Sequence, residues 1–135
     1  MTNRTSERYA CANGSPGRAR RFCVATLRRS FGDDTRSEVI ADAELIVSEL
    51  ITNAIDAHCG EAQLTLTVDD DTVRIEVEDD GTGLPHLADA RPTDLRGRGL
   101  VIVAALSTRW GYEKLTRGKL VWAELAARSI ALTSA

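Results

Sequence analysis

The sequence predicts an α+β protein, a two-layer sandwich in which helices cover one face of a mostly antiparallel sheet. Two long segments, 15–29 and 37–58, carry apolar residues at helical spacing. Two further regions, 64–77 and 109–126, each hold a pair of alternating segments joined by a short polar turn. Helices followed by hairpins favour an antiparallel sheet that is covered by helices on one side.

Length and composition indicate one globular domain. The 135 residues are 43% hydrophobic and 27% charged, and the net charge of −3 gives no reason to expect nucleic-acid binding. No apolar run is long enough to span a membrane, and the N-terminus lacks the apolar core of a signal peptide. We expect a cytoplasmic protein with a flexible tail at 1–14, a domain at 15–126 and a second tail at 127–135.

The three cysteines, Cys11, Cys23 and Cys59, lie far apart in the chain. They form no Cys-x-x-Cys pair, and the two histidines do not complete a zinc set. We therefore predict free thiols in a reducing compartment. His58 next to Cys59 is interpreted as a helix end before Gly60, rather than as an activated nucleophile.

The helix boundaries follow from capping residues. The first helix is expected to begin at Ser15 and Pro16, because serine caps helices and proline fits the first turn. Ser37 is the expected cap of the second helix and Gly60 its stop. Before the first helix, residues 9–12 form at most a short edge strand. The arginines of the first helix are interpreted as a solvated face, with a partner-protein surface as the alternative.

The remaining elements are shorter. The aspartates at 69–71 are interpreted as a solvated hairpin turn, because the spacing of a calcium loop is absent. Residues 86–98 are irregular and charged, and the glycines at 97 and 99 open an apolar helix at 100–106. Strands at 109–115 and 119–126 close the chain around a turn at 116–118. Trp122 in the last strand is expected to be buried against the helices.

The strand 73–77 ends in an unusual way, at Asp79. Three apolar side chains of this strand share one face, and Asp79 falls on that same face where an apolar residue is expected. A buried carboxylate without a partner is strongly destabilising, so Asp79 needs a fixed partner or lines a pocket. Gly81 and Gly83 then allow positive φ values and a close approach of the backbone to a ligand. The pattern predicts a ligand site.

Two further motifs carry phosphate chemistry. Glu49 and Asn53 lie one helical turn apart on a narrow polar stripe. An asparagine oxygen suits Mg²⁺, and a neighbouring glutamate accepts protons from an attacking hydroxyl. Gly97 and Gly99 place free amide groups at a helix N-terminus, where phosphate binds. Each motif alone has a structural alternative, a solvated helix face for the first and a helix cap for the second.

In combination, the motifs resemble the GHKL nucleotide-binding fold shared by gyrase, Hsp90, histidine kinases and MutL. The N box is similar to residues 49–57 and the first glycine box to residues 79–83. The second glycine box is similar to residues 97–100, and the weaker terminal box to residues 118–122. The resemblance covers about residues 15–126.

The resemblance implies a role for each matching residue, with ATP and Mg²⁺ as cofactors. Asp79 would accept a hydrogen bond from the adenine amino group, Asn53 would hold Mg²⁺, and Glu49 would be the catalytic base. Residues 86–98 would form a lid over the phosphates. The remaining nucleotide-binding positions would be Gly81, Gly83, Gly97, Arg98, Gly99 and Leu100.

The chain further resembles the anti-sigma factor serine kinases of the RsbW and SpoIIAB type, in their small actinobacterial branch. The segments 19–22, 43–50 and 109–112 carry this likeness. It implies a protein that sequesters a sigma factor when bound to ATP and phosphorylates a serine of a STAS-type antagonist, with a homodimer plausible. The alternative is a catalytically silent ATP-binding module that acts by sequestration. Asp56 departs from this branch and is interpreted as a surface substitution, with an adjustment of metal or water contacts as the alternative.

Overall fold

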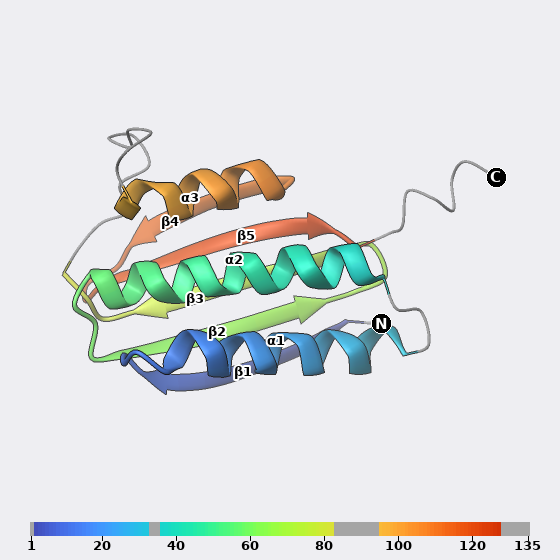
Figure 1. Ribbon diagram of the computed structural model, residues 1–135, viewed down its shortest axis with the longest axis horizontal. Coiled ribbons are helices and arrows are strands. Elements are labelled where there is room, and N and C mark those ends of the chain that lie inside the picture. The colour runs from blue at the N-terminus through green and yellow to red at the C-terminus, as the bar shows by residue number, and fades with distance from the viewer. Residues whose placement is uncertain (1, 33–35, 83–94, 128–135) are drawn as a thin grey trace.

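A computed structural model describes residues 2–32, 36–82 and 95–127. Within these residues, five antiparallel strands form one sheet in the order β1-β2-β3-β5-β4, and three helices lie on one face of it (Figure 1). The predicted two-layer α+β sandwich is confirmed. The strands are β1 (Asn3–Ala10), β2 (Glu61–Val68), β3 (Thr72–Asp79), β4 (Arg109–Lys114) and β5 (Lys119–Ala126). The helices are α1 (Ser15–Phe31), α2 (Ser37–Asp56) and α3 (Leu95–Leu106).

The core lies between the sheet and the helices. Side chains alternate along β3 and β5, so that every second residue faces the helices and is buried. The apolar face predicted for α2 packs onto this layer, and its residues Ala43, Ile46, Val47, Leu50, Ile51 and Ala54 are all buried. The register places Ala62 opposite Asp79 and Val68 opposite Val73. Asp79 therefore lies at the end of the sheet where β2 begins.

The N-terminal strand is longer than expected. β1 pairs with β2 along its whole length, from Asn3 opposite Val68 to Ala10 opposite Glu61, so most of the predicted flexible tail is a strand. Its sequence lacks alternation because β1 is an edge strand whose side chains are mostly exposed. Tyr9 is the exception and is buried.

The helix ends differ in detail from the predicted caps. Gly14 is the N-cap of α1, and the Ser15 hydroxyl instead donates to the Ala10 carbonyl, which closes the turn after β1. α2 begins at Ser37 as expected, although the cap position is Arg36 and no side chain caps the helix. At its other end α2 stops at Asp56, before the predicted stop at Gly60, because the chain must turn back there to enter β2.

The prediction of free thiols is wrong for two of the three cysteines. Cys11 and Cys59 form a disulfide, with Cα atoms 5.8 Å apart. They meet because Cys11 follows β1 and Cys59 precedes β2, and these strands pair antiparallel. This proximity depends on strand pairing across 48 positions and leaves no trace in local spacing. Cys23 is a free thiol and is buried in α1.

The prediction for Trp122 is also wrong. Val121 and Ala123 face the helices, so the alternation of β5 turns Trp122 to the opposite face of the sheet. There its ring lies 4.4 Å from the guanidinium of Arg74 and 5.6 Å from that of Arg109. The aromatic ring is therefore held by cation–π contacts rather than by the core.

Glu124 lies beside this tryptophan and binds both arginines. Its carboxylate accepts hydrogen bonds from Arg109 and Arg74, each at 2.7 Å. Arg109 first, and then Arg74, hold the pKa of the Glu124 carboxyl below its ordinary value. Glu124 therefore stabilises the fold above the ordinary carboxyl pKa of about 4.3, and this contribution is lost as the pH falls through the lower folded value.

We expect Glu124→Gln to lower the melting temperature at neutral pH and to have a smaller effect in acid. Thermal unfolding of both proteins, followed from about pH 7 down to about pH 3, measures this difference. Melting temperatures that converge in acid agree with the ion-pair assignment. A constant difference over the whole series would contradict it.

Candidate functional site

Asp79 ends β3 as a buried carboxylate with two partners. Its side chain is on the inward face as predicted, and the residue is 3% exposed. Asp79 Oδ2 lies 2.8 Å from Nζ of Lys119, and Asp79 Oδ1 accepts a hydrogen bond of 2.9 Å from the Gly81 amide. A carboxylate has about four lone-pair positions, so these two contacts leave it able to accept a further donor.

Lys119 is the residue of this site that the sequence analysis missed. It begins β5 directly opposite Asp79, and its side chain is only 1% exposed. The sequence did contain a signal for the burial of Lys119. This lysine lies on the inward face of a strand whose next inward residues, Val121 and Ala123, are apolar. A buried acid and a buried base that both break an apolar pattern are expected to pair.

The turn before β5 brings Lys119 to this position. Leu115 donates its amide to the carbonyl of Gly118, which closes the hairpin between β4 and β5. Gly118 has a φ of 80°, and a Cβ atom there would lie 1.7 Å from the carbonyl oxygen of Asp79. Only glycine fits, because the backbone of this turn passes directly against the end of β3.

The end of α2 lies against the start of the first glycine box. The Ala57 carbonyl accepts a hydrogen bond of 3.0 Å from the Thr82 amide. A Cβ atom at Gly81 would lie 2.5 Å from the same carbonyl oxygen. Gly81 is therefore required by close approach, whereas the positive φ values found among the described glycines are at Gly32 and Gly118.

Asp80, the residue between Asp79 and Gly81, also connects the glycine box to the segment that follows α2, on the surface of the protein. Its Oδ1 atom accepts hydrogen bonds from the amides of Gly60, at 2.7 Å, and Glu61, at 3.1 Å. These bonds, with Glu61 first, hold the pKa of the Asp80 carboxyl below its ordinary value. The glycine box is thus anchored to the connection between α2 and β2.

Glu49 and Asn53 lie on α2 just before this anchor. Both side chains are half-buried, and the Asn53 carbonyl accepts the amide of Ala57, the residue that contacts the glycine box. Neither side chain has a hydrogen-bond or ion-pair partner in the part of the chain that the structure describes. An amide oxygen without a protein partner is a suitable ligand for Mg²⁺. A carboxylate without a protein partner is a suitable acceptor for a proton. Asp56, by contrast, is exposed.

Part of the predicted site lies outside the described residues. This applies to Gly83 and to residues 86–94 of the expected lid. α3 begins at Leu95, so the glycines at 97 and 99 lie inside this helix rather than before it. The free amides at the start of a helix are those of the cap and of the first three residues, so the Gly97 amide still belongs to this group and the Arg98 amide does not. The expected phosphate contacts of Gly97, Arg98, Gly99 and Leu100 stay predictions, and the Leu100 side chain is buried in the core.

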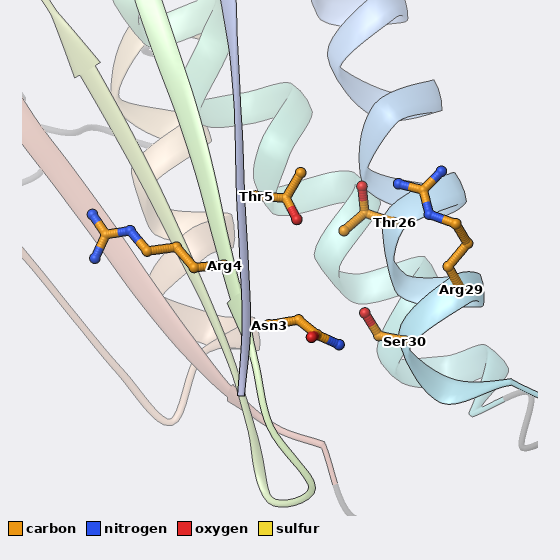
Figure 2. Close-up of a pocket in the computed structure, with 6 residues that line it drawn as sticks. All are labelled: Asn3, Arg4, Thr5, Thr26, Arg29 and Ser30. Atoms are coloured by element: carbon orange, nitrogen blue, oxygen red, sulfur yellow. The ribbon is translucent and has the colours of Figure 1, made fainter. Parts of the chain in front are cut away.

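A separate hollow of about 180 Å³ lies between β1 and α1. Figure 2 shows Thr5 and Thr26 facing each other across it, with Arg4 directed away. The Thr26 hydroxyl is buried and has no hydrogen-bond partner among the described residues. Asn3, at one end of this hollow, pairs with Val68, whereas Asp79 pairs with Ala62 at the opposite end of β2. The hollow is therefore distinct from the site around Asp79.

A one-sided α+β sandwich, with a buried carboxylate against a glycine turn and an Asn/Glu helix beside it, defines an ATP-binding domain of the histidine-kinase type. A family model described as histidine kinase-like ATPase domain matches residues 13–125, and the chain belongs to this family. A search of curated proteins found no match. The family implies a nucleotide ligand, usually with Mg²⁺. Among the helices that the structure describes, none is long and apolar enough to cross a membrane.

Proposed function

We propose that this protein binds ATP with Mg²⁺, sequesters a sigma factor, and phosphorylates a serine of a STAS-type antagonist. The observation that carries the nucleotide part is Asp79, a buried carboxylate whose two protein contacts leave lone pairs free. The match of the histidine kinase-like ATPase family over residues 13–125 supports the same ligand. The partners rest on the resemblance to the RsbW and SpoIIAB type.

Base recognition in this proposal belongs to Asp79. The adenine amino group would donate to a free lone pair of the carboxylate, which Lys119 and Gly81 hold in one orientation. Because the site is buried, such a hydrogen bond to a charged acceptor is stronger than the same bond in water. A base with a carbonyl oxygen in place of the amino group would meet the carboxylate with an acceptor, which opposes binding.

The phosphoryl-transfer part belongs to α2. The Asn53 side-chain oxygen would be a ligand of Mg²⁺, which supplies charge neutralisation to the phosphates. Glu49, one turn earlier, would accept the proton of the attacking serine hydroxyl. A phosphate on the antagonist adds a charge of about −1.5 to −2, and this charge weakens its binding and frees the kinase for the sigma factor.

We expect Glu49→Ala to retain ATP binding and to lower phosphoryl transfer by about 100-fold or more, because a positioned base typically contributes that much. Titration calorimetry with ATP measures the binding, and transfer of label from ATP to purified STAS-type proteins measures the activity. Asp56→Ala is the matched control, since this exposed carboxylate lies about two turns further along the same helix. It should leave both quantities unchanged.

The outcomes separate the proposal from its alternative. No ATP binding at millimolar nucleotide would overturn the proposed function. ATP binding without transfer to any antagonist of the panel would overturn the kinase part and favour the silent module. In that case Glu49→Ala would also leave sequestration of the sigma factor unchanged.

A further inference from the structure

The disulfide joins the residue after β1 to the loop before β2, at the end of the β1–β2 ladder. Cys11 follows β1, Cys59 lies between α2 and β2, and 48 positions separate them. The backbone contact between these segments is the hydrogen bond of 3.0 Å from the Cys11 amide to the Gly60 carbonyl. β1 pairs with β2 alone in this sheet, so its end is held from one side only. The covalent bond therefore adds a cross-link where the ladder of this edge strand ends.

Cys59 belongs to the loop 57–60, which is the support of the first glycine box. The Ala57 carbonyl binds the Thr82 amide, and Gly81 packs against that same carbonyl. At the other end of the loop, the Gly60 amide donates to the Asp80 carboxylate at 2.7 Å. Residues 80–82 are thus bound to the loop at both of its ends.

The loop also connects the two halves of the nucleotide site. On the side of α2, the Ala57 amide bonds to the carbonyl of Asn53. On the side of β3, Gly81 donates to the carboxylate of Asp79. When the loop is fixed, the candidate metal ligand Asn53 and the base-binding carboxylate of Asp79 stay at a fixed separation. When the loop moves, the positions of both groups change.

We propose that the Cys11–Cys59 disulfide is a redox switch of the nucleotide site, which binds ATP more tightly when the disulfide is closed. The inference rests on the proposed ATP binding and concerns its regulation. Closing the bond preorganises the loop 57–60, so less ordering is left for the nucleotide to bring about. Opening the bond removes the covalent cross-link and leaves the hydrogen bond from Cys11 to Gly60 and the β1–β2 ladder that ends at Ala10 and Glu61.

The chemistry is a thiol–disulfide exchange with a small disulfide as oxidant. The thiolate of one cysteine attacks a sulfur of the oxidant and releases one small thiol. The second cysteine then attacks the mixed disulfide, forms the Cys11–Cys59 bond and releases the other small thiol. Two protein thiols are oxidised by two electrons, and the oxidant is reduced to two thiols.

The third cysteine is an internal control. Cys23 is fully buried in α1, and this burial raises the pKa of its thiol to about 12. A buried, protonated thiol does not take part in exchange. Cys11 and Cys59 are only half-buried, so a small disulfide reaches them.

The test is ATP titration of the wild-type protein after oxidised glutathione and after a phosphine reductant. We expect the oxidised form to bind ATP about 3- to 10-fold more tightly, the gain that preorganisation of a few groups provides. The double variant Cys11→Ser/Cys59→Ser should bind like the reduced protein under both conditions. Cys23→Ala should keep the full redox response.

Two further readouts make the result independent of the variants. A thiol count after unfolding should give one free thiol in the oxidised protein, and amide exchange at residues 57–61 should slow on oxidation. Three thiols after oxidant treatment, or equal ATP affinity in the two redox states, would overturn the switch while leaving ATP binding in place. Absence of ATP binding in both states would overturn the proposed function, and the switch with it.

Discussion

Lys119→Met is expected to lower the free energy of unfolding by about 3–5 kcal/mol, because it leaves the Asp79 carboxylate buried without its cation. Lys119 and Asp79 each have side chains 1% exposed, so water does not replace the lost partner. Methionine has a volume close to that of lysine, and the change therefore removes the charge with little effect on packing. Urea unfolding at neutral pH measures the loss.

The double variant Asp79→Asn/Lys119→Met is the control for this prediction. Asparagine keeps an oxygen for the Gly81 amide, and neither buried charge is left alone. Each single change should destabilise strongly, and the double change should destabilise by much less than their sum. A coupling energy of about 2 kcal/mol or more agrees with a buried ion pair. Additive effects would show that Lys119 does not act through Asp79.

The same cycle separates stability from base recognition. The double variant should regain stability and should not regain ATP binding, because asparagine presents a neutral amide to the adenine amino group in place of a charged acceptor. Calorimetric titration of ATP into the double variant measures this. Recovery of wild-type affinity would contradict the role of the Asp79 carboxylate in binding the base.

Gly118→Ala is expected to destabilise the protein by about 4 kcal/mol or more, in the range that only a severe backbone conflict produces. Gly118 has a φ of 80°, and the new Cβ atom would lie 1.7 Å from the carbonyl oxygen of Asp79. Backbone atoms on both sides must then move, and the turn that delivers Lys119 to Asp79 moves with them. Thermal or urea unfolding measures the change.

Gly32→Ala is the matched control for this second prediction. Gly32 also has a positive φ, of 60°, but beyond its chain neighbours no heavy atom of the described residues lies within 4 Å of the position that a Cβ would take. It should therefore show only the conformational penalty of a left-handed residue, about 1–2 kcal/mol. The difference between the two variants measures the close contact with Asp79. Equal losses would mean that the contact is relieved without disturbing the site.

Much of the fold was predictable because it depends on local periodicity. The apolar face of α2 and the alternation of β2, β3 and β5 report which side of each element is buried, whatever lies opposite. The observed bounds of β5 agree with the predicted strand at 119–126, and α1 ends two residues later than predicted. Such patterns depend only on neighbouring residues in the chain.

The candidate site was partly predictable for the same reason. Asp79 broke an apolar alternation, and this predicted that it is buried with a partner or lines a pocket. In the structure Asp79 is buried and is paired with Lys119. The identity of that partner depended on which strand lies beside β3. Lys119 is 40 positions away in the chain and meets Asp79 only through the register of β3 and β5.

Two of the wrong predictions share one physical cause. The edge strand β1 and the Cys11–Cys59 disulfide both depend on pairing between distant segments. A mostly polar edge strand has no periodicity to detect, and a cysteine pair 48 positions apart has no local spacing rule. For Trp122, the large apolar surface suggested burial, whereas the alternation of β5 decided the face.

The sequence by itself determined the class of fold, the order of its elements and the burial of an acid at the end of β3. These follow from side-chain periodicity and from the free energy of burying a charge. The tertiary structure alone decided that Asp79 pairs with Lys119, and that a disulfide connects β1 to the loop beneath the glycine box. Both depend on strand register, which is set by the packing of the whole sheet and not by any one segment of the chain.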